Sequence, residues 1–225
     1  MSTARTRRSS QPPAPRRPSR RPIGRHSNGM LMTPEEFDRR SDFDDRYRYE
    51  LIHGVLVVSP APGISERDPN GELEYLLRNY KWNHPSGTLI DKTVSEEYIY
   101  LPDGRRRADR VVWIGLGRIP EPGKDVPAIA IEIVSNRQRD RVRDYEEKRR
   151  EYLAAGVQEY WGIDRFRRTM TVYRKEPAEP AEVVVKEGEV YATPLLPGFE
   201  LPLARLLQAA DDWKRPAAPA PADPK

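Results

Sequence analysis

Residues Pro127 to Val134 read PAIAIEIV, the most continuously apolar stretch of the chain. A short run of this kind is typical of a central strand that is covered on both faces of a sheet. Its one charged residue is Glu132, and an ionised carboxylate in such a strand costs several kcal/mol unless it is paired, hydrogen-bonded or bound to a cation. The stretch therefore predicts a buried sheet with an acid that needs a partner.

The segments that precede this strand alternate between helix and strand patterns. Thr33-Pro34-Glu35-Glu36 predicts a helix start, with Thr33 as N-cap and Glu36 completing a capping box. Tyr49 to Val58 (YELIHGVLVV) is predicted to be one strand, and leucines at helical spacing predict a helix over 70–82. Further strands are expected at 88–90, 94–101 and 107–114, the last two joined by a turn at Pro102-Asp103-Gly104.

The segments that follow the central strand extend the same pattern. An amphipathic helix is expected over about 140–155, with Gly156 as its C-cap. Strands of a meander then fall at 159–163, 169–173 and 183–186, and a last helix at 203–210. The whole pattern predicts an α/β (α+β) fold in which a mixed central β-sheet is flanked by helices.

Composition limits the class of protein and the kind of site. The 225 residues suit one domain, expected over 30–212, and no apolar run approaches the ~18 residues that span a bilayer. No signal peptide is visible, so we expect a cytoplasmic protein without a membrane partner. With no cysteine and only three histidines, a metal would be held by carboxylates, which suits Mg²⁺ or Mn²⁺.

The positive charge is concentrated at one end. The chain has a net charge of +4, but residues 1–30 hold eight arginines and no acid, so the remainder carries −4. Segment 1–29 is built of Arg, Pro and Ser and is predicted to be disordered, as is the Pro- and Ala-rich segment 213–225. Two other interpretations of the basic tail are an organelle transit peptide, against which its prolines argue, and a merely solubilising extension.

Three residues in and beside the central strand suggest a catalytic site. Asp109 lies at the start of a buried strand, and if that strand neighbours the one bearing Glu132, the two carboxylates converge as a divalent metal requires. Lys148 lies on the following helix, where a lysine can offset charge that develops on a phosphate. Phosphodiester hydrolysis needs this set of groups.

Each of these residues also has a structural interpretation. Asp109 and Glu132 are also explained by buried salt bridges to arginines, and spacing alone favours that interpretation. Lys148 is explained by a solvated helix face. Glu50 is either a fourth carboxylate of the cluster or a solvated residue at the start of a strand.

Several motifs in order resemble the Uma-two family of putative restriction endonucleases, over about residues 31–207. The matching stretches are Tyr49-Glu50-Leu51-Ile52-His53-Gly54, Ala108-Asp109, Ile131-Glu132-Ile133-Val134-Ser135, Asp144 with Lys148, and Ala155-Gly156-Val157-Gln158-Glu159-Tyr160-Trp161-Gly162-Ile163-Asp164. The resemblance implies a PD-(D/E)XK nuclease-like fold. It also implies that Asp109 and Glu132 are the metal carboxylates, that Glu50 is the early acid, and that Lys148 replaces the lysine usually found two residues after the acid, where this chain has Val134.

The chain departs from the family pattern at two places. Ala108 stands where a proline usually precedes the aspartate, and a histidine common after the Ser-Pro-Ala-Pro loop is missing from Gly63-Ile64-Ser65-Glu66-Arg67. The second departure removes any role for that histidine here. The set of acids and lysine is complete.

The resemblance and the residues together predict a metal-dependent endonuclease that hydrolyses DNA, with the Arg-rich tail adding affinity for phosphates that is independent of sequence. Because many nucleases that cut both strands act as dimers, a homodimer is one expected assembly. The alternative is a catalytically silent nuclease-fold module that binds nucleic acid or a protein partner.

Overall fold

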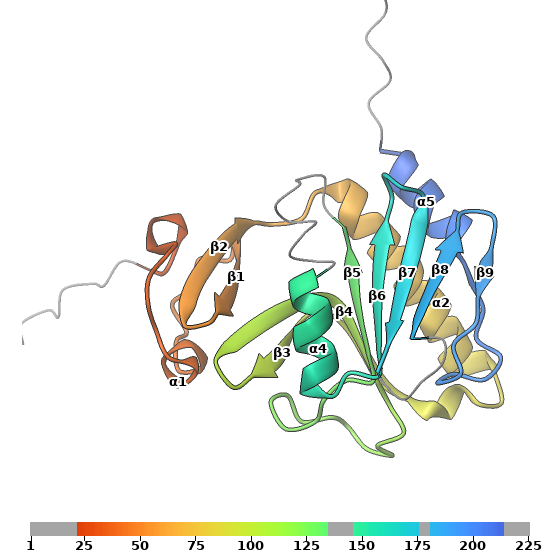
Figure 1. The fold of residues 1–225 in the computed structure, drawn as a ribbon, viewed down its shortest axis with the longest axis horizontal. Coiled ribbons are helices and arrows are strands. Elements are labelled where there is room, and N and C mark those ends of the chain that lie inside the picture. The colour runs from red at the N-terminus through yellow and green to blue at the C-terminus, as the bar shows by residue number, and fades with distance from the viewer. Residues whose placement is uncertain (1–21, 135–145, 176–180, 214–225) are drawn as a thin grey trace, which may run out of the picture.

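The computed structural model describes residues 22–134, 146–175 and 181–213. Strands β1 to β8 form one sheet (Figure 1). Neighbouring strands follow the order β2-β1-β4-β5-β6-β7-β8, and β3 pairs with β4. The strands are β1 (Tyr47–Ile52), β2 (Val55–Pro60), β3 (Ile90–Leu101), β4 (Gly104–Ile114), β5 (Ile129–Ile133), β6 (Glu159–Asp164), β7 (Thr169–Arg174) and β8 (Glu182–Lys186). The pair β9 (Val190–Tyr191) and β10 (Leu201–Pro202) forms a separate small sheet.

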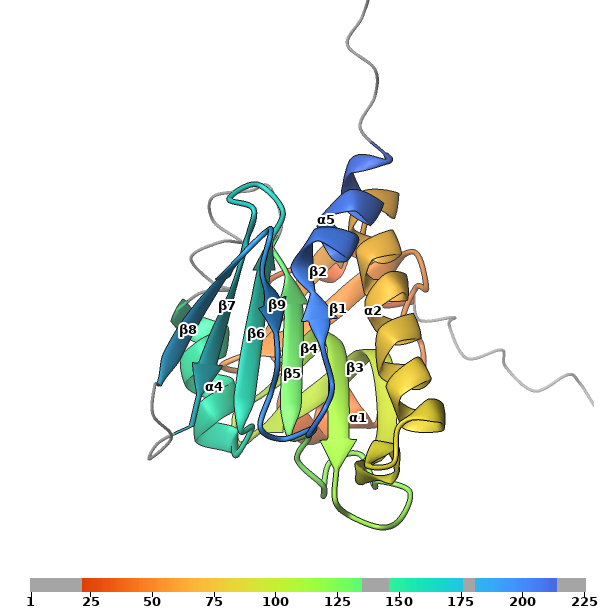
Figure 2. The same cartoon turned by 90° about the vertical axis from the view of Figure 1, so that its right-hand side faces the viewer.

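Helices cover both faces of the sheet. They are α1 (Pro34–Asp38), α2 (Ile64–Asn83), α4 (Lys148–Ala155) and α5 (Leu203–Asp211), with short 3₁₀ turns η1 (Arg25–Ser27) and η2 (Gly87–Leu89). Figure 2 shows α2 and α5 together on one face and α4 on the other. The predicted mixed sheet flanked by helices is confirmed, and its β5–β6 pair is parallel whereas its other neighbouring strands are antiparallel.

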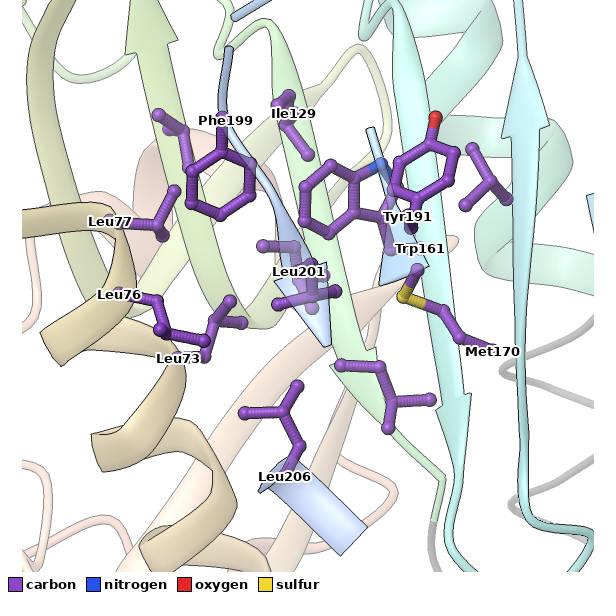
Figure 3. Packing of buried hydrophobic residues seen from close by; sticks show 14 of the residues in the cluster. Leu73, Leu76, Leu77, Ile129, Trp161, Met170, Tyr191, Phe199, Leu201 and Leu206 are labelled. Atoms are coloured by element: carbon purple, nitrogen blue, oxygen red, sulfur yellow. The ribbon is translucent and has the colours of Figure 1, made fainter. Parts of the chain in front are cut away.

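The core is largest between the sheet and the α2–α5 layer. There Leu73 and Leu77 of α2 and Leu206 of α5 pack on Ile129 and Trp161 of the sheet (Figure 3). The opposite face carries a smaller cluster that includes Ala130 and Tyr152. Because successive side chains of a strand alternate between faces, Glu132 follows Ala130 toward α4, and Ile129 and Ile131 point to α2.

The predicted single strand over Tyr49 to Val58 is wrong. Its centre is a two-residue turn in which His53 (φ 48°) and Gly54 (φ 77°) both have positive φ, so the segment folds into the β1–β2 hairpin. Turns with positive φ at both central residues match the twist of the strands that they join, and glycine adopts this conformation without steric cost. The hairpin lies at one end of the molecule and joins β4 through the register pair Leu51↔Arg105.

Several other element limits differ from the predicted ones. Helix α2 begins at Ile64, six residues before the predicted start, and contains Pro69 in its second turn. The predicted strands at 88–90 and 94–101 are η2 followed by one strand, β3, with an irregularity between Ile90 and Lys92. The first part of the helix predicted from residue 140 lies outside the described residues, and α4 ends as predicted at Gly156 (φ 113°).

Residues 22–29, which composition predicts to be disordered, make defined contacts. Ile23 is 4% exposed and bridges to Phe43, and the backbone N–H of Gly29 donates to the carbonyl of Leu56. These contacts place residues 22–29 on the β1–β2 hairpin, so the predicted disorder does not hold for them. At the other end Trp213 donates to Asp68 at 2.7 Å, whereas residues 1–21 and 214–225 lie outside the described part of the chain.

Candidate active site

Glu132 is held by two residues of one helix face. It is 4% exposed, and its Oε1 accepts from Lys148 Nζ at 2.7 Å and from Tyr152 OH at 3.0 Å. Lys148 and Tyr152 are four residues apart on α4, so both side chains lie on the face that covers β5. Burial and the nearby carboxylates raise the pKa of Tyr152, which therefore remains a protonated donor to Glu132.

Asp109 lies beside the backbone of the same strand. Strands β4 and β5 are antiparallel neighbours, with Arg110 opposite Ile131, as the convergence of the two acids requires. Asp109 Oδ2 accepts from the backbone N–H of Ile133 at 2.7 Å, so its carboxylate contacts the peptide group that follows Glu132. The two acids are thereby fixed on adjacent strands at one place in the sheet.

Glu50 is brought to the same cluster by the hairpin. It lies within β1 and is 7% exposed, so the interpretation as a solvated residue at a strand start is wrong. Its Oε1 accepts from the backbone N–H of Arg107 at 3.1 Å and lies 3.6 Å from Lys148 Nζ. Lys148 Nζ also donates to the Arg107 carbonyl at 3.1 Å, and the lysine is 3% exposed rather than solvated.

The structure therefore brings Glu50, Glu132 and Lys148 into one buried network and places Asp109 beside it. Asp144, which accompanies Lys148 in the family motif, lies outside the described residues. Tyr152 was not predicted as a partner of Glu132, although it lies four residues after Lys148 on the predicted helix. Arg48 was not predicted either, because no local sequence pattern ties it to Asp109, 61 residues away.

Arg48 supplies the salt bridge that the structural interpretation of Asp109 predicted. Its Nη2 lies 2.8 Å from Asp109 Oδ1, and the same nitrogen is paired with Glu96 on β3. Asn70 of α2 donates to the Asp109 carbonyl at 2.8 Å and accepts from Arg110 Nε at 2.6 Å. Asp109 is thus fixed from the hairpin, from α2 and from β5.

The donor chemistry of this site fits a hard divalent cation. Asp109 and Glu132 offer carboxylate oxygens from adjacent strands, the ligand type that Mg²⁺ and Mn²⁺ prefer. Within residues 22–134, 146–175 and 181–213 no group of three or more His, Asp and Glu side chains is close enough to hold a metal. The protein's own cations, Arg48 and Lys148, balance the two acids instead.

A family model and a solved structure are both similar to this chain. The family model described as "Uma2: Putative restriction endonuclease" matches residues 34–204, a span that includes all four predicted site residues. A solved structure of a putative nuclease belonging to DUF820, from Anabaena variabilis ATCC 29413, is similar with a TM-score of 0.64 and 20% identity over 80% of this chain and 99% of that one. At that identity the likeness concerns the fold alone. No curated protein matches the sequence. None of the described helices is both long and apolar enough to pass through a bilayer.

Proposed function

The chain belongs to the Uma2 family of putative restriction endonucleases, and from this premise we propose that it is a Mg²⁺- or Mn²⁺-dependent endonuclease that hydrolyses DNA phosphodiester bonds. One observation supports the proposal most: a buried lysine is held on Glu132, and the carboxylate of Asp109 contacts the next peptide group. An acid pair with an adjacent ammonium group supplies the charges that phosphodiester hydrolysis requires.

The proposed roles follow from the contacts of each side chain. Asp109 and Glu132 would hold the metal ion, which when bound polarises the phosphate and activates water. Lys148 stabilises the negative charge that develops on the phosphate, and Tyr152 fixes the orientation of Glu132 through its hydrogen bond. Glu50 lies against Lys148 and directs its ammonium group toward Glu132.

Cleavage of plasmid and single-stranded DNA with Mg²⁺ or Mn²⁺ tests this function, with a chelator as the first control. The variants Asp109→Asn and Glu132→Gln keep the shape of each acid and accept hydrogen bonds from Ile133 and Lys148, but lose the charge. We expect both variants to remain folded and to lose metal binding. Their cleavage rate should fall by about a hundredfold or more, which is the effect of removing one group that stabilises charge in the transition state.

Glu159→Gln is the matched control, because Glu159 is equally buried but lies in a separate network with Arg174 and Tyr191. Its folded fraction should cleave DNA at the unchanged rate. If Asp109→Asn and Glu132→Gln cleave as well as Glu159→Gln does, these acids are not the catalytic ones and the proposed site is wrong.

A second candidate is a silent nuclease-fold module that binds nucleic acid or protein. The observation in its favour is that Arg48 and Lys148 already neutralise both acids. In that case the folded wild-type chain would bind DNA without metal-dependent nicking, and the two variants would change its stability but not its affinity for DNA.

A further inference from the structure

A cleft of about 350 Å³ opens beside Asp109, between the β1–β2 hairpin, β3, β4 and α2. Four arginines line it, from three different elements: Arg48, Arg67, Arg107 and Arg110. Arg110 is 1% exposed and is fully engaged by Asn70, Thr93 and Glu74, so it is part of the wall. The other three present charge to the cleft.

Glu96, which lines this cleft, and Asp109 share the Nη2 of Arg48. In the β3–β4 ladder Ser95 pairs with Arg110 and Glu97 pairs with Ala108, so Glu96 lies opposite Asp109. Like charges directly opposite each other destabilise a sheet. Glu96 also has a positive φ of 59°, a conformation that costs energy for a residue other than glycine.

Arg48 and Arg107 hold Glu96 in this position. Arg48 Nη2 pairs with both Glu96 and Asp109, whereas Arg107 Nε donates to the Glu96 backbone carbonyl and forms an ion pair with its carboxylate at 3.1 Å. The Nε of Arg48 is buried without an acceptor among the residues that the structure describes. Two guanidinium groups around one carboxylate, with donor capacity left over, form a site for a tetrahedral anion.

We propose that this cleft binds the backbone phosphates of the nucleic acid strand beside the scissile bond, and that Arg48 exchanges Asp109 and Glu96 for a phosphate when the strand binds. The inference rests on the proposed function for the identity of the strand. Arg67 extends the site outward, because it is exposed at the cleft and forms no ion pair with any described residue. A purely structural Arg48, which only separates two acids, is the competing explanation.

DNA binding, measured under conditions that prevent cleavage, distinguishes the proposed phosphate exchange from a purely structural role of Arg48. The full chain is titrated against a short fluorescein-labelled single-stranded DNA in Ca²⁺, over a range of NaCl concentrations, and affinity is read as anisotropy. Arg48→Gln should weaken binding roughly tenfold and reduce the salt slope by about 0.7, the effect of one lost phosphate contact. Glu96→Gln should tighten binding on the order of fivefold, because the competing carboxylate is gone.

Arg118→Gln is the matched control, since Arg118 is paired with Asp125 in a loop outside the cleft and is 50% exposed. Mn²⁺ binding, followed by electron paramagnetic resonance, provides a second measurement. Arg48→Gln should bind Mn²⁺ at least as tightly as wild type, because Arg48 competes for Asp109.

Opposite shifts of Arg48→Gln and Glu96→Gln support the proposal even if the wild type proves unable to cleave DNA, which would count against the proposed function alone. If both variants retain the affinity and salt slope of Arg118→Gln, or if Arg48→Gln loses Mn²⁺ affinity, the exchange is wrong. Thermal unfolding followed by circular dichroism confirms that each variant compared is folded.

Discussion

Two buried glutamates of this molecule show why burial alone does not identify an active-site acid. The carboxylate of Glu159 accepts from Trp161, Tyr191 and Thr193 at 2.9–3.1 Å, and Arg174 Nε lies 3.2 Å away. These donors satisfy the hydrogen-bonding capacity of a buried carboxylate. Glu159 is therefore a structural acid.

Glu132 has a different environment. Its partners, Lys148 and Tyr152, come from the helix that covers the strand, and the lysine is shared with a second acid, Glu50. Buried Arg106 also interacts electrostatically with Glu50, so positive side chains of the protein itself surround this group of acids. Glu132 is thus the acid whose partners include a cation shared with another acid.

The variant Lys148→Met tests how much the buried ion pair between Lys148 and Glu132 contributes to the free energy of unfolding. Removing one partner of a buried ion pair typically costs about 3–5 kcal/mol, and the double variant Lys148→Met, Glu132→Gln should recover part of that loss. Urea denaturation of wild type, both single variants and the double variant measures this coupling.

The matched control is Lys124→Met. Lys124 and Glu121 are also 2.7 Å apart, but their side chains are 77% and 54% exposed, so water screens the pair and the loss should be far smaller. Equal losses at the two lysines would show that the Lys148 pair is no stronger than a surface pair.

Among the elements, the β1–β2 hairpin controls the geometry of the site because it carries both Arg48 and Glu50. It meets the main sheet at Leu51↔Arg105, next to Gly104. A Cβ at Gly104 would lie 2.5 Å from the Leu51 carbonyl oxygen, closer than van der Waals contact allows. Only glycine at this position lets β1 approach β4.

Gly104→Ala should therefore push the hairpin away and cost about 1–3 kcal/mol, the range for overpacking a close contact. Hydrogen exchange should increase in β1 and β2, and DNA cleavage should fall although every predicted catalytic residue is intact. Gly71 on α2 is the control, because a Cβ there would meet no atom within 4 Å. Gly71→Ala should raise the free energy of unfolding by up to about 1 kcal/mol through helix propensity. Unchanged exchange in the hairpin of Gly104→Ala would show that the contact does not position it.

The elements also show what the sequence can predict. The central strand, the Thr33 capping box and the Gly156 C-cap were correctly predicted because each depends on residues within a few positions of one another. The His53-Gly54 turn was missed because the apolar pattern continues through it on both sides. Pro69 concealed the first turns of α2, since proline usually marks a helix start rather than its second turn.

The sequence pointed to the acids and the lysine that the structure brings together, but not to the residues around them. The hydrophobic pattern placed Asp109 and Glu132 on strands and Lys148 on the helix that follows, whereas it left open whether the two strands are neighbours. The contacts of Arg48 with Asp109 and Glu96 depend on how the hairpin packs against β3 and β4. No periodicity in the sequence encodes such a long-range contact.

In the molecule as a whole, residues 1–21 are strongly basic, whereas residues 22–225 carry a slight excess of acidic residues. Residues 1–21 hold seven arginines and no acid, which leaves 32 basic and 35 acidic residues in 22–225. A nuclease domain with this slight negative balance gains affinity for DNA from the tail if the arginines neutralise phosphates.

Deleting residues 1–21 should therefore weaken DNA binding and flatten its salt dependence, while the cleavage rate at saturating protein stays unchanged. The cut is made before Pro22 because Ile23 and Gly29 pack on the hairpin, and a deletion to residue 29 would disturb Arg48 as well. A full-length chain with its seven tail arginines changed to glutamine is the matched control. If neither protein changes in affinity or in salt slope, the tail is only a solubilising extension.

The lysine of this site reaches its acid from α4 and not from β5, where Val134 stands two residues after Glu132. The connection between the parallel strands β5 and β6 passes through that helix, so the ammonium group and the acid are joined by a long stretch of backbone whose length is not fixed by the sheet. Relatives that insert or delete residues there can keep the same three-dimensional arrangement while losing any constant spacing. We therefore expect a spatial template of two carboxylates and one amine to find such sites where a sequence motif with fixed spacing does not.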